Sequence, residues 1–492
     1  MCRLFVILLL CCACARTLPG GVRCSAAGGP VWHEYRSRHF NVDTDLDTQE
    51  AAALVRELET LHAMVVRALV NEDREVPGRV RVVVPANDRT YAALAPPAVV
   101  GYFTRGQFEE PTAVIHPAAL RSDPEIIAHE LVHHLVWYFF PRRPTWFDEG
   151  IAQFLQTVAN PDPRFHGDAG LVPRLRAPRL GEIAQMPAKE ILAWRGDYSI
   201  YEADMGELWS WVLYHWLWTY RRDRLADYEF RLASGEDPAR AWMAAFPDLD
   251  PKEPAAMKKL DEALDRHRRD DKISYYRVEV KPDTSFTSAA LSSADVHMML
   301  LAIRDNWRPP AGEYYSTALR ADPAIASRKE IEEALREDPG NPVALWYSLR
   351  THKPAAAIAL RKSAATHPAD WRSWYTLSLV LRTREDHDEM VAALRKAVDL
   401  NPDQAAVSND LAALLLVDGH PKEALPFAQR AVELAPSHAV SLDTLAGIAA
   451  ALDQCAQALQ LEQRAVDLML PKNAAGPRKR LREYQQRCGS AR

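Results

Sequence analysis

Two histidines and two glutamates are spaced so that they could bind a metal ion and use it. His129, Glu130 and His133 lie in the run His-Glu-Leu-Val-His, and Glu149 follows in a second segment. In a helix, residues four apart share one face, so His129 and His133 would point two imidazoles at one ion. Glu130 would then reach a water on that ion, and Glu149 would complete a His2Glu ligand set. Three protein ligands with one open position are typical of a catalytic zinc site.

A helix with recognisable ends is predicted to carry the two histidines. Asp123 can serve as its N-cap, Pro124 as its first residue and Glu125 as an acid in its first turn. Pro141 and Pro144 end it. The apolar side of this helix is formed by Ile126, Ile127, Leu131, Leu135 and Val136.

A second helix is predicted to begin near Trp146 and to carry Glu149 on its first turn. Trp146, Glu149, Gly150 and Ala152 match the W-x-x-E-G-x-A segment of the gluzincin group of zinc peptidases, which supplies the third ligand. More closely, residues 30–270 resemble the bacterial peptidase MA-like family of secreted proteins, which are often fused to helical repeats. The resemblance implies an α+β zincin-like metallopeptidase domain, which we place at 31–272.

The resemblance also implies a role for each residue of the site. Zn2+ would be the cofactor, His129, His133 and Glu149 its ligands, and Glu130 the general base of peptide hydrolysis. Some gluzincins carry an Asp four residues after the ligand Glu, and that Asp orients a ligand histidine. Here Gln153 stands at that position. The groups that orient the two histidines are therefore left open, although ligand histidines usually have such partners.

Three further residues could belong to the site or could have a purely structural role. Tyr198 and Tyr201, at the start of a helix predicted over 201–220, are candidates for a hydroxyl donor to the oxyanion. A structural role is the commoner use of a tyrosine in that place. His134 points about 100° away from its neighbour around the helix, so we expect it to be packed and not to be a ligand.

The elements before the metal-binding helix indicate a small sheet. The sequence alternates over 35–43, has helical periodicity over 48–69, and contains β-branched runs over 80–84 and 112–116. This order is the zincin layout, in which a sheet packs on the active-site helix. In such enzymes the strand before that helix pairs with extended substrate, so 112–116 is predicted to bind peptide by strand addition.

The C-terminal part repeats with a period of 34 residues. Val398, Val432 and Val466 occupy equivalent positions in three copies of a Lys/Arg-Ala-Val-Asp/Glu-Leu motif. A period of this length resembles tetratricopeptide repeats, in which each unit is a helix pair that must stack on its neighbours.

An all-α tetratricopeptide-repeat solenoid is therefore predicted over 290–488, with 471–488 as a capping helix and 273–289 as a linker. The concave face of such an array could bind a peptide or a protein partner. The array could instead only pack on the preceding domain, and both alternatives stay open.

The N-terminus has the pattern of a targeting segment. An apolar run over 4–10 and a cleavage site ending at Ala15 predict a signal peptide over 1–15. Residues 16–30 are predicted to be a disordered leader. The protein is expected to be exported to the bacterial periplasm or outside the cell, with lipoprotein anchoring through Cys14 as the alternative. No later segment is long and apolar enough for a membrane helix.

Three cysteines remain after such a leader is removed. In an oxidising compartment Cys455 and Cys488 are predicted to form a disulfide that closes the last helices, which leaves Cys24 unpaired. None of these three has C-x-x-C spacing to another, so cysteine is not expected to bind the zinc.

Composition limits the classes of function. The 492 residues are 48% hydrophobic and 26% charged, as in soluble globular proteins. A net charge of −6 and the lack of a basic block argue against nucleic acid as a partner. The sequence predicts a secreted zinc metallopeptidase that acts on peptides or proteins. The alternatives are a catalytically inactive repeat scaffold of the cell envelope with a vestigial or structural zinc site, and a zinc hydrolase with a non-peptide target such as an envelope amide.

Overall fold

The computed structural model describes residues 17–18, 22–23, 25, 28–70, 75–92, 94–95, 101–105, 108, 110–122, 124–160, 162, 164, 166–173, 180, 184–195, 200–270, 273–306, 323–350, 353–381, 386–469 and 474–489. The predicted signal peptide, Cys14, Cys24, Asp123 and Tyr198 lie outside these residues. Within the predicted disordered leader, β1 (Thr17–Leu18) pairs antiparallel with β2 (Val22–Arg23). The prediction of disorder is wrong for these four residues, because the two extended segments satisfy each other's backbone groups.

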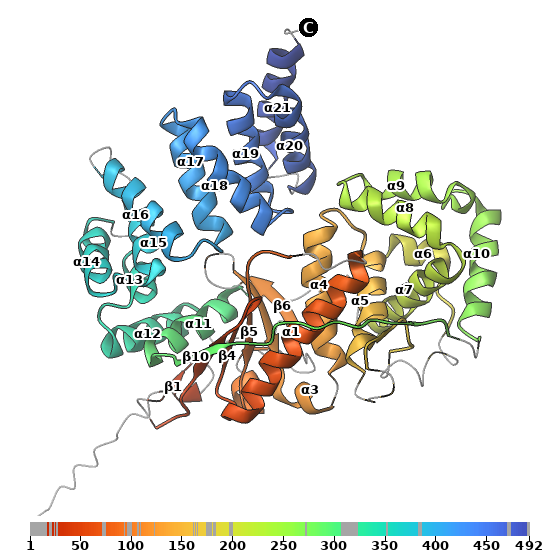
Figure 1. Ribbon diagram of the computed structural model, residues 1–492, viewed down its shortest axis with the longest axis horizontal. Coiled ribbons are helices and arrows are strands. Elements are labelled where there is room, and N and C mark those ends of the chain that lie inside the picture. Colours follow the sequence, from red (N-terminus) through yellow and green to blue (C-terminus); the bar gives the residue numbers. More distant parts are fainter. Residues whose placement is uncertain are drawn as a thin grey trace, which may run out of the picture.

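A six-stranded sheet with the order β10-β3-β4-β5-β7-β6 forms the centre of the N-terminal region (Figure 1). Its strands β4, β5 and β7 are parallel, and β6 is an antiparallel edge strand with one unpaired edge among the described residues. The strands are β3 (His33–Arg36), β4 (Phe40–Thr44), β5 (Val80–Val84), β6 (Gly101–Arg105), β7 (Pro111–Ile115) and β10 (Thr287–Ala290).

Two sequence predictions about this sheet are wrong. The alternating stretch 35–43 is a hairpin of two strands, because the chain turns at Ser37–His39 between β3 and β4. Residues 112–116 cannot accept an added strand, since β7 is paired on one side with β5 and on the other with β6. The outer edges of the sheet belong to β6 and β10, and of these β6 lies beside α4.

Helices cover both faces of the sheet. Side chains alternate along a strand, so Val82 and Val84 of β5 face one way and Val83 faces the other. The first pair belongs to the core shared with α1 (Thr48–Val70) and α4 (Glu125–Phe139). Val83 packs instead with Val296, Leu300 and other residues of α11 (Ser293–Asn306).

The helix α5 (Thr145–Leu155) lies against α7 (Ile200–Tyr220) at unusually close range. A Cβ placed on Gly150 would lie 2.6 Å from the carbonyl oxygen of Ser210 and 2.9 Å from Cβ of Tyr214. Only glycine permits this approach, which explains the glycine after Glu149 in physical terms. The remaining elements of the N-terminal region are α2 (Asp88–Ala92), α3 (Pro117–Ser122), η4 (Gln156–Ala159), β8 (Asp168–Ala169), α6 (Ala188–Ala193), α8 (Arg222–Ala233), α9 (Pro238–Ala245), η6 (Pro247–Leu249), α10 (Pro254–His267) and β9 (Tyr276–Arg277).

The C-terminal region is an array of antiparallel helices that curves above the sheet (Figure 1). Its period is regular, because α16, α18 and α20 begin at His387, Pro421 and Cys455, 34 residues apart in each case. The helices are α12 (Pro323–Glu337), α13 (Pro342–Leu349), α14 (Lys353–Thr366), α15 (Trp371–Val380), α16 (His387–Leu400), α17 (Ala405–Val417), α18 (Pro421–Leu434), α19 (Ala439–Ala451), α20 (Cys455–Leu468) and α21 (Ala475–Gly489).

The boundary between the two regions is not a free linker. Within residues 273–289, β9 pairs with β8, and β10 adds to the sheet beside β3. The next helix, α11, was predicted to belong to the array, but it packs on the sheet and also on α12 and α13. The sequence pattern missed this because helical periodicity does not tell which partner covers each face.

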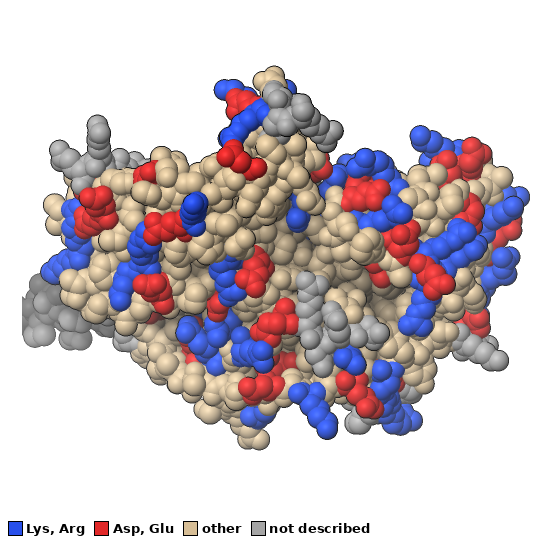
Figure 2. Space-filling model, turned by 45° about the horizontal axis from the view of Figure 1, so that its top comes forward, with Lys and Arg blue, Asp and Glu red and all other residues tan. Residues whose placement is uncertain are grey.

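Charged side chains of both signs lie on the surface of the molecule. Acidic and basic side chains are interspersed over the face shown in Figure 2. Among the described residues, no helix combines the length and the apolar character needed to cross a bilayer.

Candidate metal centre

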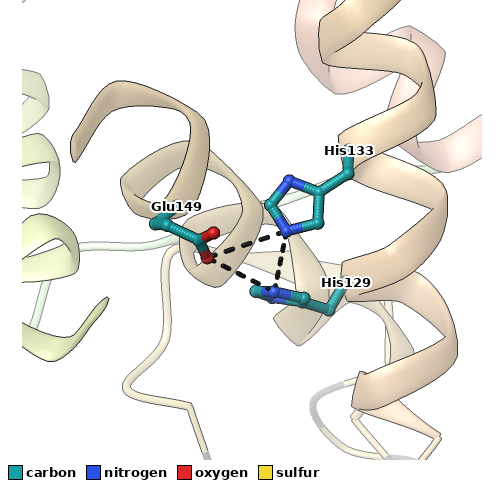
Figure 3. A group of neighbouring side chains, drawn as sticks. All are labelled: His129, His133 and Glu149. Atoms are coloured by element: carbon teal, nitrogen blue, oxygen red, sulfur yellow. Dashed lines mark hydrogen bonds and ion pairs between the residues drawn. The ribbon is translucent and has the colours of Figure 1, made fainter. Parts of the chain in front are cut away.

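The structure brings His129, His133 and Glu149 together in one group (Figure 3). The two Nε2 atoms of the histidines lie 3.0 Å apart. Oε2 of Glu149 lies 3.5 Å from Nε2 of His129 and 3.6 Å from Nε2 of His133. Ligand atoms at about 2.0–2.1 Å from a tetrahedral zinc would be separated by about 3.3 Å, so the three atoms match the spacing that zinc requires.

Two helices position these three ligand atoms. His129 and His133 lie one turn apart on α4, and Glu149 is the fifth residue of α5, one position beyond the first turn on which it was predicted. Pro144 has extended backbone at the start of α5 and separates the helices. Phe140 and Phe147 pack edge to face at 5.2 Å across the turn, which holds the end of α4 against α5.

Oε2 of Glu149 is the clearest sign that this group is built for a cation. The atom is buried and has no hydrogen-bond donor among the described residues. A buried carboxylate oxygen without a donor is costly, and a bound cation would remove that cost. Two imidazoles and a carboxylate are also the donor set that zinc accepts in catalytic sites. The residues present therefore fit Zn2+.

The second nitrogen of each histidine is held by a partner that the sequence reading did not identify. Nδ1 of His129 lies 2.8 Å from Oε1 of Gln156, and Nδ1 of His133 lies 3.2 Å from Oδ1 of Asp148. Both contacts direct Nε2 of the ring toward Glu149. Gln153 donates to Glu207 instead, at 3.1 Å, and does not orient either histidine.

Further polar contacts hold the side chains of Asp148 and Gln156 in place. The Asp148 carboxylate forms an ion pair with Arg143 at 2.8 Å. Nε2 of Gln156 donates to Glu125 at 3.3 Å, which leaves its Oε1 facing His129. The positions of Asp148 and Gln156 in the sequence could have indicated that they lie near the histidines. Asp148 directly precedes Glu149, and Gln156 follows it by seven residues, which is two helical turns on the same side.

Negative charge dominates the electrostatics of the group. Burial alone would lower the pKa of His133, but Glu149 and Asp148 outweigh it and raise that pKa to about 10. The pKa of His129 is likewise raised, since Glu149 and Glu130 outweigh burial and the charge of His133. Burial raises the pKa of Glu130 above its ordinary value, although both histidines oppose the change. The group therefore favours occupation by positive charge.

Glu130 belongs to α4, and its side chain lies beside the start of the edge strand β6. A Cβ on Gly101, the first residue of β6, would lie 3.4 Å from Cγ and 3.8 Å from Oε1 of Glu130. Burial, and to a lesser extent the charge of Glu130, raise the pKa of the Tyr91 hydroxyl. That hydroxyl is buried and has no hydrogen-bond partner among the described residues. The sequence reading did not single out Tyr91.

The structure describes the side chains of some of the remaining residues considered in the sequence analysis, but not of all of them. His134 is buried and stacks on Phe103 of β6 at 5.3 Å, which confirms that it packs and points away from the ligand group. The side chain of Tyr201 lies outside the described residues. Cys455 is disulfide-bonded. The side chain of its predicted partner, Cys488, lies outside the described residues.

The repeat array lies directly against α4, the helix that carries His129 and His133. Oγ of Ser437 donates to the carbonyl of Trp137 at 2.7 Å. Arg79 forms an ion pair with Asp403 of the array at 2.5 Å. A cavity of about 290 Å³ separates the two regions beside the ligand group. Its walls include His133, His134, Phe103 and Trp137 from the N-terminal region, and Gln404, Leu434 and His438 from the array.

The connection between β6 and β7 inserts a side chain into the array. The ring of Phe108 contacts Trp346, Trp371 and Tyr375 at centroid distances of 5.9, 5.6 and 5.0 Å. Phe108 has φ of 54°, a left-handed conformation that costs energy for a phenylalanine. The aromatic contacts offset this cost, so the array holds the end of the edge strand.

Comparison with known proteins identifies the repeats. The family model of the tetratricopeptide repeat matches residues 372–404. No curated protein matches the chain. Similar solved structures include a thermophilic tetratricopeptide-repeat protein of Thermus thermophilus, TTC0263, with 19% identity over 33% of this chain and 91% of that chain, at a TM-score of 0.27.

Two further structures are similar at the same low level. YrrB, described as a tetratricopeptide-repeat protein with an unusual peptide-binding site, has 21% identity over 32% of this chain and 84% of its own, with a TM-score of 0.27. Yeast Tom70 has 10% identity over 89% of this chain and 83% of its own, with a TM-score of 0.32. The matched repeat lies within the regular helical array. The chain is a tetratricopeptide-repeat protein whose array follows an N-terminal mixed α/β region.

Proposed function

We propose that this chain is a zinc-dependent metallopeptidase, with His129, His133 and Glu149 as the zinc ligands and Glu130 as the general base. The observation that carries the proposal is the spacing of the three ligand atoms, which lie 3.0 to 3.6 Å apart around one point. The two oriented histidines and the donor-free oxygen of Glu149 support it.

Glu130 is suited to the proton transfers of peptide hydrolysis. Bound Zn2+ would supply Lewis-acid chemistry, because it lowers the pKa of a coordinated water and polarises a carbonyl. Glu130 would accept a proton from the attacking water as the new C–O bond forms. It would then deliver that proton to the leaving nitrogen as the C–N bond breaks. Burial raises the pKa of this carboxyl group, which brings it closer to that of the proton donor.

The neighbouring surfaces support an extended peptide as substrate. The free edge of β6 begins at Gly101, beside Glu130, and offers backbone donors and acceptors to an added strand. The cavity beside His133 has Phe103, Trp137 and Leu434 in its walls and would suit an apolar side chain. Tyr91 is a candidate hydroxyl donor, because its hydroxyl has no hydrogen-bond partner among the described residues and feels the charge of Glu130.

The array would serve protein partners in this proposal, since tetratricopeptide repeats are a protein-binding scaffold. Because Ser437 and Asp403 contact the N-terminal region near the ligand group, a protein bound to the array would lie close to the proposed cleft.

The test compares the zinc-loaded wild type with Glu130→Gln on a broad peptide library, with product analysis by mass spectrometry. Loss of about three orders of magnitude in turnover with zinc retained is expected for Glu130→Gln. Glu190→Gln, the same change at an exposed position of α6, is the matched control and should leave turnover unchanged. If neither the wild type nor the control cleaves any peptide with zinc bound, the proposal gives way to an inactive scaffold or a hydrolase of non-peptide bonds.

A second measurement tests the ligand assignment separately. Glu149→Ala should lose zinc from the site, because two imidazoles alone bind the ion much more weakly. Full zinc occupancy of this site in Glu149→Ala would show that Glu149 is not a ligand.

A further inference from the structure

A polar cavity lies between the sheet and the repeat array, on the face of the sheet that α11 covers. Its walls include residues of β4 and β5, residues of α11, and the first residues of α15 in the array. The cavity has a volume of about 270 Å³, which equals that of about nine water molecules. A space of this size suits a small ligand.

Strand register explains why polar side chains line this cavity. Asn41 and Asp43 are two residues apart on β4, so their side chains lie on the same face of the sheet. Arg81 of β5 is in register with Asn41, and Thr112 of β7 is in register with Arg81. Further along this face Val83 packs on α11. The face is therefore apolar under the helix and polar beside the array.

Two buried oxygen atoms in the cavity wall have no hydrogen-bond donor among the described residues. They are Oδ1 of Asp43 and Oδ1 of Asn41, whose residues are 0% and 7% exposed. The other carboxylate oxygen of Asp43 accepts a hydrogen bond from Arg81, which also donates to Glu110 at 2.7 Å. A buried acceptor without a donor is costly, and a ligand that donates hydrogen bonds would remove that cost.

The charges around the cavity favour a cation. Its walls carry five carboxylates and three guanidinium groups, which belong to Glu34, Asp43, Glu110, Asp295 and Asp370, and to Arg36, Arg81 and Arg372. Each guanidinium group already forms an ion pair with one or more of these carboxylates. Burial, opposed by Arg81, raises the pKa of Asp43 to about 7, so near neutral pH a cation can replace the proton on this carboxyl group.

The apolar part of the wall favours an organic cation over a metal ion. Met299 and Ile303 are four residues apart on α11, so they form one stripe along the cavity, and Trp371 lines it from the array. Asp43 belongs to no group of three metal-ligand side chains in the part of the chain that is described. An ammonium group can donate three hydrogen bonds, and an aliphatic chain attached to it would contact the apolar stripe.

We propose that this cavity binds a primary ammonium group on a short aliphatic chain, with Asn41 and Asp43 as its hydrogen-bond acceptors. Because the walls come from both regions, the ligand would also stabilise the contact between the sheet and the array. The proposal does not depend on the zinc site, since α4 packs on the opposite face of the sheet.

The experiment titrates the full-length chain with pentan-1-amine and with pentan-1-ol, a neutral probe of the same length, by isothermal calorimetry. The wild type should bind the amine with a Kd of about 1 mM, about 10- to 100-fold more tightly than the alcohol. Asp43→Asn should weaken binding of the amine at least about tenfold. Asp223→Asn, the same change at an exposed position of α8, is the matched control and should bind as the wild type does. Equal affinity for the two probes, or no binding of the amine, would overturn the proposal.

A second variant decides the question if Asp43→Asn does not fold. Asn41→Val removes the other acceptor and places a residue that strands favour, so the melting temperature should rise while the affinity for the amine falls about tenfold. Unchanged affinity in this variant would show that Asn41 is not part of a binding site. Nα-acetyl-lysine methylamide distinguishes two sources of the ammonium group. Affinity equal to that of pentan-1-amine would assign it to a lysine side chain, and weaker binding would assign it to a free amine.

Discussion

Replacing Gly150 with alanine should weaken the packing of α5 on α7 and disturb the proposed ligand group at the same time. The added Cβ would lie 2.6 Å from the carbonyl oxygen of Ser210, whereas ordinary contacts begin at 3.4 Å. The two helices must therefore separate by about 0.8 Å, since a backbone oxygen inside a helix cannot rotate away. Glu149 precedes Gly150 directly and would move with it.

The expected loss of stability in Gly150→Ala follows from two opposing effects. Overpacking of a well-filled core costs about 1–3 kcal/mol, and the upper part of that range, about 2–3 kcal/mol, applies here because the contact is with backbone. Alanine regains about 1 kcal/mol of helix propensity over glycine. The net loss of about 1–2 kcal/mol would lower the melting temperature by about 3–6 °C for a unit of this size. A ligand displaced by most of an ångström should also weaken zinc binding by at least about tenfold.

Thermal unfolding by circular dichroism and a competitive zinc-binding assay measure the two effects. Gly476→Ala is the matched control, because it lies in α21 and its Cβ would meet nothing closer than 3.6 Å. That control should be neutral or slightly stabilising, with unchanged zinc affinity. A Gly150→Ala chain as stable as the wild type would refute the close approach of α5 and α7.

Three further changes test other parts of the structure. Asp148→Asn removes the charge that holds Nδ1 of His133, so zinc affinity measured by competition should fall about 10- to 100-fold, whereas Gln153→Leu should leave it unchanged. Phe108→Ala removes the ring that the array holds, and should speed hydrogen exchange of the β6 edge and destabilise the chain by about 1–3 kcal/mol. Burial beside a second carboxylate raises the pKa of Glu462 from 4.5 to about 8, so its contribution to stability is complete below pH 4.5 and is lost as the pH rises through 8. Urea unfolding at pH 5 and pH 9 should therefore show that Glu462→Gln stabilises the chain by about 1–2 kcal/mol more at the higher pH, and no difference would contradict the raised pKa.

The local elements of this fold could be predicted from the sequence where one period or one motif dominates. The helix predicted over 48–69 is α1, the strand over 80–84 is β5, and the 34-residue period is that of the paired helices of the array. In the candidate site, the grouping of His129, His133 and Glu149 follows from spacing along two neighbouring helices.

What could not be predicted depends on contacts between distant segments. The order of strands places β6 at the sheet edge, and nothing in its five residues distinguishes an edge strand from an internal one. Asp148 and Gln156 reach the histidines because α5 and η4 both pack against α4. His297 on α11 meets Glu330 and Glu333 on α12 although an undescribed segment separates the two helices, so no spacing in the sequence marks this cluster.

The sharing of α11 between sheet and array has a consequence for dividing the protein. A chain cut just before Ser293 would leave Val83, Val114 and Trp32 on an uncovered face of the sheet. An array that began at α12 would leave the apolar residues of its first helix pair open to water as well. Each fragment would then carry a surface prone to self-association. The smallest soluble N-terminal fragment should therefore extend through residue 306, and the two parts are not interchangeable modules despite the repeat boundary in the sequence.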